Sequence, residues 1–299
     1  MSADTEDGRF PSVSRIALYA VLVAMALFYL APLETGLMTA IKTQDAFFSS
    51  TPFVPPFGDG FTLEPWYEAW ATMQGPLTDF SGALYNSAFV AIPATVLSGL
   101  IGSVAAYGLT NLNWRGQAGV LMLFVAGMFV PYQSVLVPLT RFWTIVGLQN
   151  YLAGVPFLAQ RVGLIELVVT HTAYGIPICT ILFRSYYASF DESMLEAARI
   201  DGATFSRIYR RIIFPLSKPM FAVVLIYQFT QVWNDFLFAL VLVSSPTSEV
   251  ATIALNKLQG SMVQQYNVQM AAAFVAALPT LLVYVLFGDQ FAEGVAGET

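Results

Sequence analysis

The sequence predicts an all-α polytopic membrane protein with six transmembrane helices and a charged helix-turn-helix between the fourth and fifth. Three observations carry this prediction. Of the 299 residues, 57% are hydrophobic and only 11% are charged, whereas soluble domains carry about 25% charged residues. Apolar stretches of about 20 residues, the length needed to cross a bilayer, recur six times. The densest cluster of charge lies in one loop between two of these stretches.

Composition also excludes several classes of function. The formal net charge of −6 leaves no basic excess for binding nucleic acid. The only cysteine is Cys179 and the only histidine is His171, so the chain forms no internal disulfide and we expect no metal site. The first 15 residues are polar and acidic, unlike the basic start of a signal peptide, and the first apolar stretch is therefore expected to be a retained membrane helix.

The predicted spans organise the chain into one membrane domain, residues 16–287, between an N-terminal tail, residues 1–15, and a C-terminal tail, residues 288–299. The charged loop between spans four and five covers residues 184–218. The six spans are predicted at residues 16–39, 85–109, 118–139, 163–183, 220–243 and 268–287.

The distribution of lysine and arginine predicts the orientation, because loops rich in these residues stay in the cytoplasm. Six spans place both termini on one side of the membrane. That side holds nine of the thirteen basic residues, namely Arg9, Arg15, Arg115, Arg184, Arg199, Arg207, Arg210, Arg211 and Lys218. We therefore expect a multi-pass protein of the plasma (cytoplasmic) membrane, surrounded by lipid, with both termini and the 184–218 loop in the cytoplasm.

The first external loop, residues 40–82, contains an aromatic segment with Trp66, Tyr67 and Trp70. Trp and Tyr favour the headgroup level of a bilayer, which predicts an interfacial helix here. A docking surface for an external partner is the alternative. Glu34 and Glu166 lie near predicted outer ends of spans, and we interpret both as interfacial.

The charged loop is predicted to contain two short helices. Residues 191–202 favour the first, with Ser193 and Glu196 spaced as a capping box. Gly202 is typical of the left-handed residue that follows a helix. Thr204 is placed to begin a second helix over residues 205–213, and Pro215 to end it. An ordinary basic loop that only sets topology is the alternative interpretation.

The spacing within this loop carries a resemblance to a known family. The order is Glu196-Ala197-Ala198, three residues to Gly202, nine further residues, then Ile212-Ile213-Phe214-Pro215. This resembles the signature loop, or EAA motif, of ABC importer permeases. The chain departs from the pattern at one position, since Phe214 stands where the family usually has Leu.

Weaker matches along the chain resemble the maltose-type carbohydrate permeases in particular. They keep the family's order and lie at Phe61-Thr62-Leu63 through Trp70, Tyr85-Asn86-Ser87, Trp233-Asn234-Asp235-Phe236 and Gly294-Val295-Ala296-Gly297. The resemblance implies the permease subunit of a binding-protein-dependent importer that carries a sugar by alternating access.

The source of energy follows from an absence in the sequence. The chain has no Gly-x-x-x-x-Gly-Lys-Ser/Thr phosphate loop, so we expect no enzymatic activity and no cofactor in this chain. The resemblance implies two ATP-binding partner subunits that hold ATP and Mg, a second permease subunit and an extracellular solute-binding protein. It assigns the ATPase contacts to Glu196, Ala197, Ala198, Arg199, Asp201, Gly202, Arg207 and Pro215.

Polar residues within predicted spans are candidates for the substrate path, because burying them in a bilayer is costly. Asp235 is flanked in span five by Gln231, Trp233 and Asn234, a set that could bind sugar hydroxyls and stack on a sugar face. An Asp satisfied by neighbouring amides near the outer interface is the alternative. His171 in span four fits a hydrogen-bonded packing residue better than a ligand contact.

Two other functions stay open on the sequence. One is an ABC permease for another small solute, such as an amino acid or a polyamine. The spans lack buried Lys or Arg, which favours a neutral solute over an anion. The other is a secondary transporter, for which Asp235 is the strongest titratable candidate. ATP-independent uptake by this chain alone would favour a secondary transporter.

Overall fold

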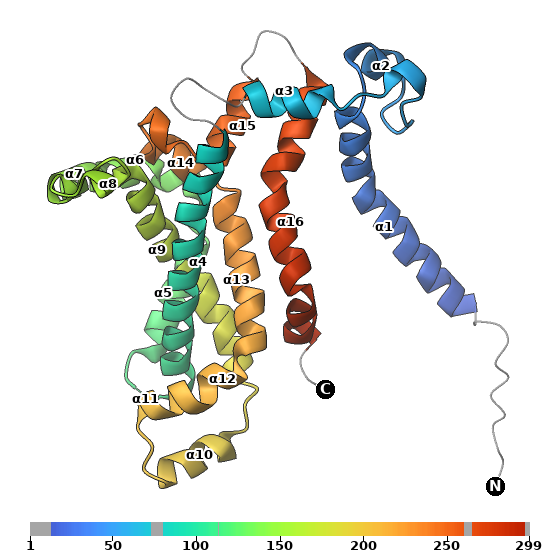
Figure 1. Cartoon of the computed structure of the whole chain (residues 1–299). Helices are drawn as coiled ribbons and strands as arrows, with labels where there is room; N and C mark the ends of the chain where they lie inside the picture. Colours follow the sequence, from blue (N-terminus) through green and yellow to red (C-terminus); the bar gives the residue numbers. More distant parts are fainter. Residues whose placement is uncertain (1–12, 73–79, 113, 260–264, 297–299) are drawn as a thin grey trace, which may run out of the picture. The chain divides into compact units, whose positions relative to one another are not determined.

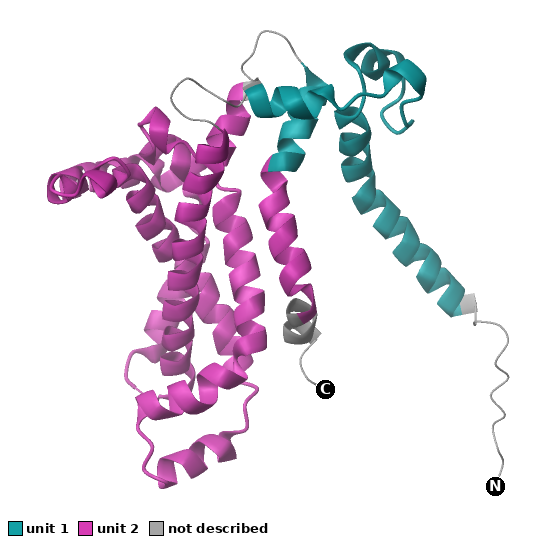
Figure 2. Ribbon diagram, in the orientation of Figure 1, with its two compact units in different colours: residues 1–71, 261–275 teal, residues 72–260, 276–299 magenta. Residues whose placement is uncertain are grey.

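The computed structural model describes residues 13–72, 80–112, 114–259 and 265–296. Residues 1–12 of the predicted N-terminal tail, and residues 297–299 of the predicted C-terminal tail with Gly297 of the terminal motif, lie outside these residues. The chain divides into two compact units (Figure 2), one of residues 1–71 and 261–275 and the other of residues 72–260 and 276–299. Within the described ranges, helices are the regular elements of both units (Figure 1), apart from an isolated antiparallel bridge between Lys42 and Phe61.

The smaller unit contains the first long helix and the predicted external loop as far as residue 71. Its buried Lys42 donates from Nζ to the carbonyl of Thr51 at 2.8 Å, and the amide of Asn267 donates to the carbonyl of Lys42 at 3.0 Å. The predicted aromatic segment forms a helix, α3. The elements of the smaller unit are α1 (Val13–Ala40), α2 (Gln44–Ser49), η1 (Gly58–Gly60), α3 (Glu64–Thr72) and the first part of α16 (Tyr266–Ala296).

The larger unit is built around α4 (Phe80–Asn111) and α9 (Val162–Tyr187), which pack along much of their length, with α13 (Lys218–Trp233) against them. Glycine permits the close approach. A Cβ on Gly102 would lie 2.6 Å from the Cβ of Cys179, and one on Gly175 would lie 2.2 Å from Nε2 of Gln228. Small residues at such crossings are how membrane helices achieve close packing.

Shorter elements complete the larger unit. They are α5 (Gln117–Met128), α6 (Tyr132–Val146), α7 (Leu148–Leu152), α8 (Pro156–Ala159), α10 (Glu192–Ile200), α11 (Phe205–Ile208), η2 (Tyr209–Ile213), α12 (Phe214–Leu216), α14 (Leu237–Leu242), η3 (Pro246–Ser248) and α15 (Ala251–Gln259).

Four predicted spans are confirmed as long apolar helices, namely the first, second, fourth and sixth in α1, α4, α9 and α16. The third was wrong as a continuous helix, because α5 and α6 meet at an angle of 102°. Pro131 precedes α6 in an extended conformation, and proline disfavours helical geometry in the residue before it. With 12 residues, α5 is about 18 Å long.

The fifth predicted span, residues 220–243, was also wrong as one helix. The helix α13 ends at Trp233, and α14 begins at Leu237. The carboxylate of Asp235 accepts the backbone N–H of Ala239 at 3.2 Å, so this side chain starts a new helix instead of continuing the old one. The helical run 205–216 joins α13 at a bend of 76°.

Candidate functional site

The charged loop folds as a compact wedge, defined here as residues 191–217, which comprises α10, α11, η2 and α12 (Figure 1). Its inner face is apolar. Leu195, Ile208 and Ile213 are at most 3% exposed and pack in one cluster with residues of α4, α9 and α13. The hydrophobic effect thus fastens the wedge to the ends of the long helices.

The first helix of the wedge begins at a different residue from the one predicted. The N-cap is Asp191, whose carboxylate accepts the backbone N–H of Ser193 at 2.9 Å. The predicted capping box of Ser193 with Glu196 was wrong, because Ser193 already lies inside the first turn. Hydrogen bonds from Ser193 lower the pKa of Asp191, so the cap stays ionised at a lower pH than an ordinary aspartate would.

The end of α10 confirms the prediction for Gly202. Its φ is +75°, in the left-handed region where glycine carries no Cβ penalty. The backbone N–H of Gly202 donates to the carbonyl of Arg199, and that of Ala203 donates to the carbonyl of Ala198, both at 3.0 Å. These two bonds form a Schellman motif, which satisfies the last carbonyls of the helix.

The second limb starts where predicted but ends later. Thr204 is the N-cap residue of α11, although its side chain makes no capping bond. Pro215 does not end the limb, which continues to Leu216 and breaks at Ser217. A π-helical turn at residues 209–213 precedes the proline, and its wider backbone accommodates a ring that has no N–H to donate.

A cluster of three hydroxyl groups links the wedge to the long helices. The Oγ of Ser103 on α4 lies 2.6 Å from the hydroxyl of Tyr187 on α9. The same Oγ lies 2.8 Å from the hydroxyl of Tyr209, the first residue of the π-turn. The ring of Tyr107 lies against those of Phe205 and Tyr209, with centroids 4.4 and 5.7 Å apart. Tyr209 of the wedge is therefore held both by a polar contact with Ser103 and by an aromatic contact with Tyr107.

The outer face of the wedge presents most of the residues that the motif assigns to a partner. Exposed there are Glu196, Ala197, Asp201, Gly202, Arg207 and Pro215. Ala198 is half-buried against the apolar cluster. Arg199 is exposed, but its guanidinium donates to the carbonyl of Asn111 at the end of α4, at 3.0 Å. Ile200 is 86% exposed.

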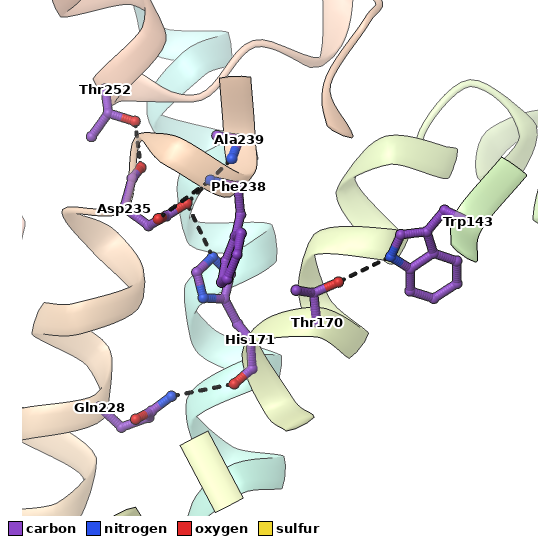
Figure 3. A network of polar contacts seen from close by, with 8 residues as sticks. All are labelled: Trp143, Thr170, His171, Gln228, Asp235, Phe238, Ala239 and Thr252. Carbon is purple, nitrogen blue, oxygen red and sulfur yellow. Dashed lines mark hydrogen bonds and ion pairs between the residues drawn. The ribbon is translucent and has the colours of Figure 1, made fainter. Parts of the chain in front are cut away.

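The candidate substrate-path residues divide into a buried group and an exposed group. In the buried group, Nε2 of His171 lies 3.4 Å from Oδ2 of Asp235, and both side chains are 5% exposed (Figure 3). The hydroxyl of Thr252 donates to the carbonyl of Asp235 at 2.7 Å. These contacts hold the break between α13 and α14 against α9 and α15. The hollow beside them measures about 10 Å³, enough for at most one water molecule.

The neighbours of Asp235 lie in different surroundings. Trp233 is 5% exposed and donates its indole N–H to the carbonyl of Ala276 at 2.9 Å. Asn234 is exposed, and its amide donates to the carbonyl of Thr230 at 2.9 Å. Gln231 is exposed on the same last turns of α13. The buried indole is therefore held by the protein, whereas the two amides face outward.

Sequence reasoning did not identify Ser103, Tyr187 and Tyr209 as a cluster. They are separated by 84 and 106 positions, and no local pattern relates them. The pairing of His171 with Asp235 was not predicted either, although each was singled out as a polar residue in an apolar segment. That signal identified both partners but not their contact.

A family model described as "Binding-protein-dependent transport system inner membrane component" matches residues 98–296. The xylose/arabinose import permease protein XacI of Haloferax volcanii is 50% identical over the full length of both chains.

Two solved structures share the fold. One is a bacterial ABC transporter involved in the import of the acidic polysaccharide alginate, with a TM-score of 0.71 and 21% identity over 95% of this chain and 99% of that chain. The other is a bacterial alginate ABC transporter in complex with an alginate pentasaccharide-bound periplasmic protein, with a TM-score of 0.63 and 18% identity over 94% of this chain and 95% of that chain.

Proposed function

The chain belongs to the family of binding-protein-dependent transport system inner membrane components, and on that premise we propose that it carries a neutral sugar, with a pentose as the first candidate. It is a multi-pass permease subunit of an ABC importer and not an enzyme. The observation that carries the choice of sugar is the full-length identity of 50% to a xylose/arabinose import permease.

The proposed assembly contains this chain, a second permease, two ATP-binding subunits and an external solute-binding protein. ATP and Mg are held by the ATP-binding subunits, because this chain has no phosphate loop. The bound periplasmic protein in a structural relative supports the external partner. The excess of arginine in residues 184–218 supports a cytoplasmic position for the wedge and for both termini.

The wedge is the proposed contact with an ATP-binding subunit. Its geometry supports this role, because one face is buried in the long-helix cluster and the other presents Glu196, Asp201 and Arg207 to solvent. A rigid element held in this way transmits displacement at its outer face to α4, α9 and α13. Closure of two ATP-binding subunits would thus rock the permease halves and alternate access to the path.

The proposed substrate path runs past the end of α13. Gln231 and Asn234 are exposed there and offer amide groups to sugar hydroxyls. The end of α13 forms one wall of this proposed path. We propose that the wall is supported by Trp233, His171 and Asp235, since all three side chains are buried. The direct contact is therefore assigned to the two amides, and the break at Asp235 sets their position.

The test is ATP-dependent uptake of radiolabelled D-xylose and D-arabinose by the complete complex in proteoliposomes. We expect uptake that requires both ATP and the external binding protein. ATP-independent uptake by this chain alone would overturn the proposal in favour of a secondary carrier. Uptake of an amino acid or polyamine in place of either pentose would leave the assignment as a permease intact. It would overturn the assignment of a sugar as the solute.

A further inference from the structure

A polar hollow of about 510 Å³ lies in the larger unit, far from the wedge. Its walls come from the end of α6, the start of α7, the first turns of α9 and the end of α14 with the segment after it. The wedge contacts the opposite end of α9. Since α9 has 26 residues, these ends are about 39 Å apart.

The lining has a single charge and many neutral polar groups. Thr140, Thr144, Ser244 and Ser245 supply hydroxyls, and Gln149, Asn150 and Gln160 supply amides. Glu166 is the one charged side chain among the described residues of the lining. A hollow of this size is within the range of small-molecule sites, about 300–1,000 Å³.

The carboxylate of Glu166 has no partner within the described part of the chain, in which it makes no hydrogen bond or ion pair. It is half-buried. The nearest cation in the sequence, Arg161, is directed elsewhere. Its guanidinium donates to the carbonyl of Phe157 at 3.1 Å and lies 4.0 Å from the centre of that ring. Glu166 is therefore an acceptor without a donor in a largely polar hollow.

The walls around Glu166 are fastened to one another. Trp143 on α6 donates its indole N–H to the hydroxyl of Thr170 on α9 at 3.1 Å. The hydroxyl of Ser248 donates to the carbonyl of Gln160 at 3.0 Å. At Gly163 the start of α9 approaches α14 so closely that a Cβ would lie 2.6 Å from the carbonyl oxygen of Leu242. The hollow is thus a preorganised cavity.

We propose that this hollow is a binding site for a free neutral sugar, which it holds between release from the external binding protein and entry into the membrane path. The carboxylate of Glu166 accepts hydrogen bonds from sugar hydroxyls. The amides of Gln149, Asn150 and Gln160 donate hydrogen bonds to other sugar hydroxyls or accept hydrogen bonds from them. An anionic ligand is disfavoured, because the only charge in the lining is negative. The inference rests on the proposed function and on the outward position that the arginine distribution gives to this end of α9.

The first experiment measures binding without the external protein. The complex of both permeases and both ATP-binding subunits, in nanodiscs, is titrated with D-xylose and observed by saturation-transfer difference NMR. Glu166→Ala is expected to raise the apparent Kd about tenfold, the effect of one lost hydrogen bond to a charged group, and Gln149→Ala about fivefold, the effect of one lost hydrogen bond between neutral groups. Glu166→Gln keeps the shape of the hollow and tests the charge alone. Glu34→Ala, at the other predicted interfacial glutamate, is the matched control and keeps the wild-type Kd.

The second experiment measures sugar imported per ATP hydrolysed by the complete complex. Glu166→Ala is expected to lower this ratio, because sugar released without a holding site escapes outward, while ATPase activity in the absence of the binding protein stays at the wild-type level. If Glu166→Ala does not assemble, Gln149→Ala on the exposed rim serves in its place.

The outcomes separate this inference from the proposed function. Wild-type pentose uptake with unchanged xylose binding and unchanged sugar per ATP in every variant would overturn the site and leave the importer intact. The hollow would then be filled by solvent or covered by a partner subunit. Failure of the wild-type complex to import any sugar would overturn both.

Discussion

The hydroxyl of Tyr209 in the wedge lies 2.8 Å from Oγ of Ser103 in the C-terminal half of α4. Tyr187 approaches the same Oγ from α9, so one serine joins the wedge to both principal helices of the larger unit. The contact is partly buried, and the rings of Tyr209 and Tyr187 lie against those of Tyr107 and Phe183. A displacement of the wedge would therefore be transmitted through this contact to α4 and α9.

Tyr209→Phe is expected to weaken this link with little effect on folding. Loss of one hydroxyl contact costs about 1 kcal/mol, because the ring and its packing remain. We expect sugar transported per ATP to fall several-fold, while ATPase activity of the complex is retained. The ratio is measured in proteoliposomes, with Tyr151→Phe as control because Tyr151 is 80% exposed. An unchanged ratio in Tyr209→Phe would refute the link.

Gly202 is expected to tolerate alanine but not proline. A Cβ at this position meets nothing within 4 Å, so Gly202→Ala costs only the left-handed backbone, about 1 kcal/mol. Proline fixes φ near −65° and removes the N–H that bonds Arg199. Thermal unfolding and ATP-driven uptake of the two variants are compared. Equal uptake by both would show that the Schellman turn is not needed.

Asp235→Ala is expected to destabilise the larger unit by at least about 2 kcal/mol, because it leaves the N–H of Ala239 and the imidazole of His171 without their acceptor. His171→Ala alone should cost less, since the cap of α14 survives. A double-mutant cycle, read by chemical denaturation in detergent, should give a coupling energy of about 0.5–3 kcal/mol. Strict additivity would mean that the two side chains do not interact.

The close crossing of α4 and α9 predicts opposite responses of two glycines on one helix. Gly102→Ala places a Cβ 2.6 Å from that of Cys179, and such overpacking costs about 1–3 kcal/mol. Gly108→Ala meets nothing within 4 Å and favours the helix. Apparent Tm in detergent is expected to fall for the first and to hold or rise for the second. An equal change in the apparent Tm of both variants would mean that α4 and α9 do not cross closely at Gly102.

The long helices and the end of α10 were predictable, because they depend on local signals. Unbroken apolar length marks α1, α4, α9 and α16, and Gly202 marks the end of α10. The breaks in the other two predicted spans were not recognised. The side chain of Asp235 competes with its own helix for backbone N–H groups, and hydropathy does not record that competition.

The site was predictable only where its residues are neighbours in sequence. The motif from Glu196 to Pro215 is contiguous, and the fold leaves most of its named residues exposed. Arg199 was grouped with them, although the end of α4 engages its guanidinium. The Ser103 cluster and the hollow at Glu166 bring together distant segments, whose pairing depends on the three-dimensional packing of α4, α6, α9 and α14.

The most direct measurement is ATP-driven pentose uptake by a complex that carries Glu196→Lys. Glu196 is exposed on α10 and supports no internal contact in the described part of the chain, so this charge reversal should leave the fold and the apparent Tm of the complex intact. We predict uptake below about a tenth of the wild-type rate, because loss of a charge-assisted contact is worth at least about 1.5 kcal/mol. Uptake at the wild-type rate would contradict the assignment of the wedge as the element through which ATP hydrolysis drives transport.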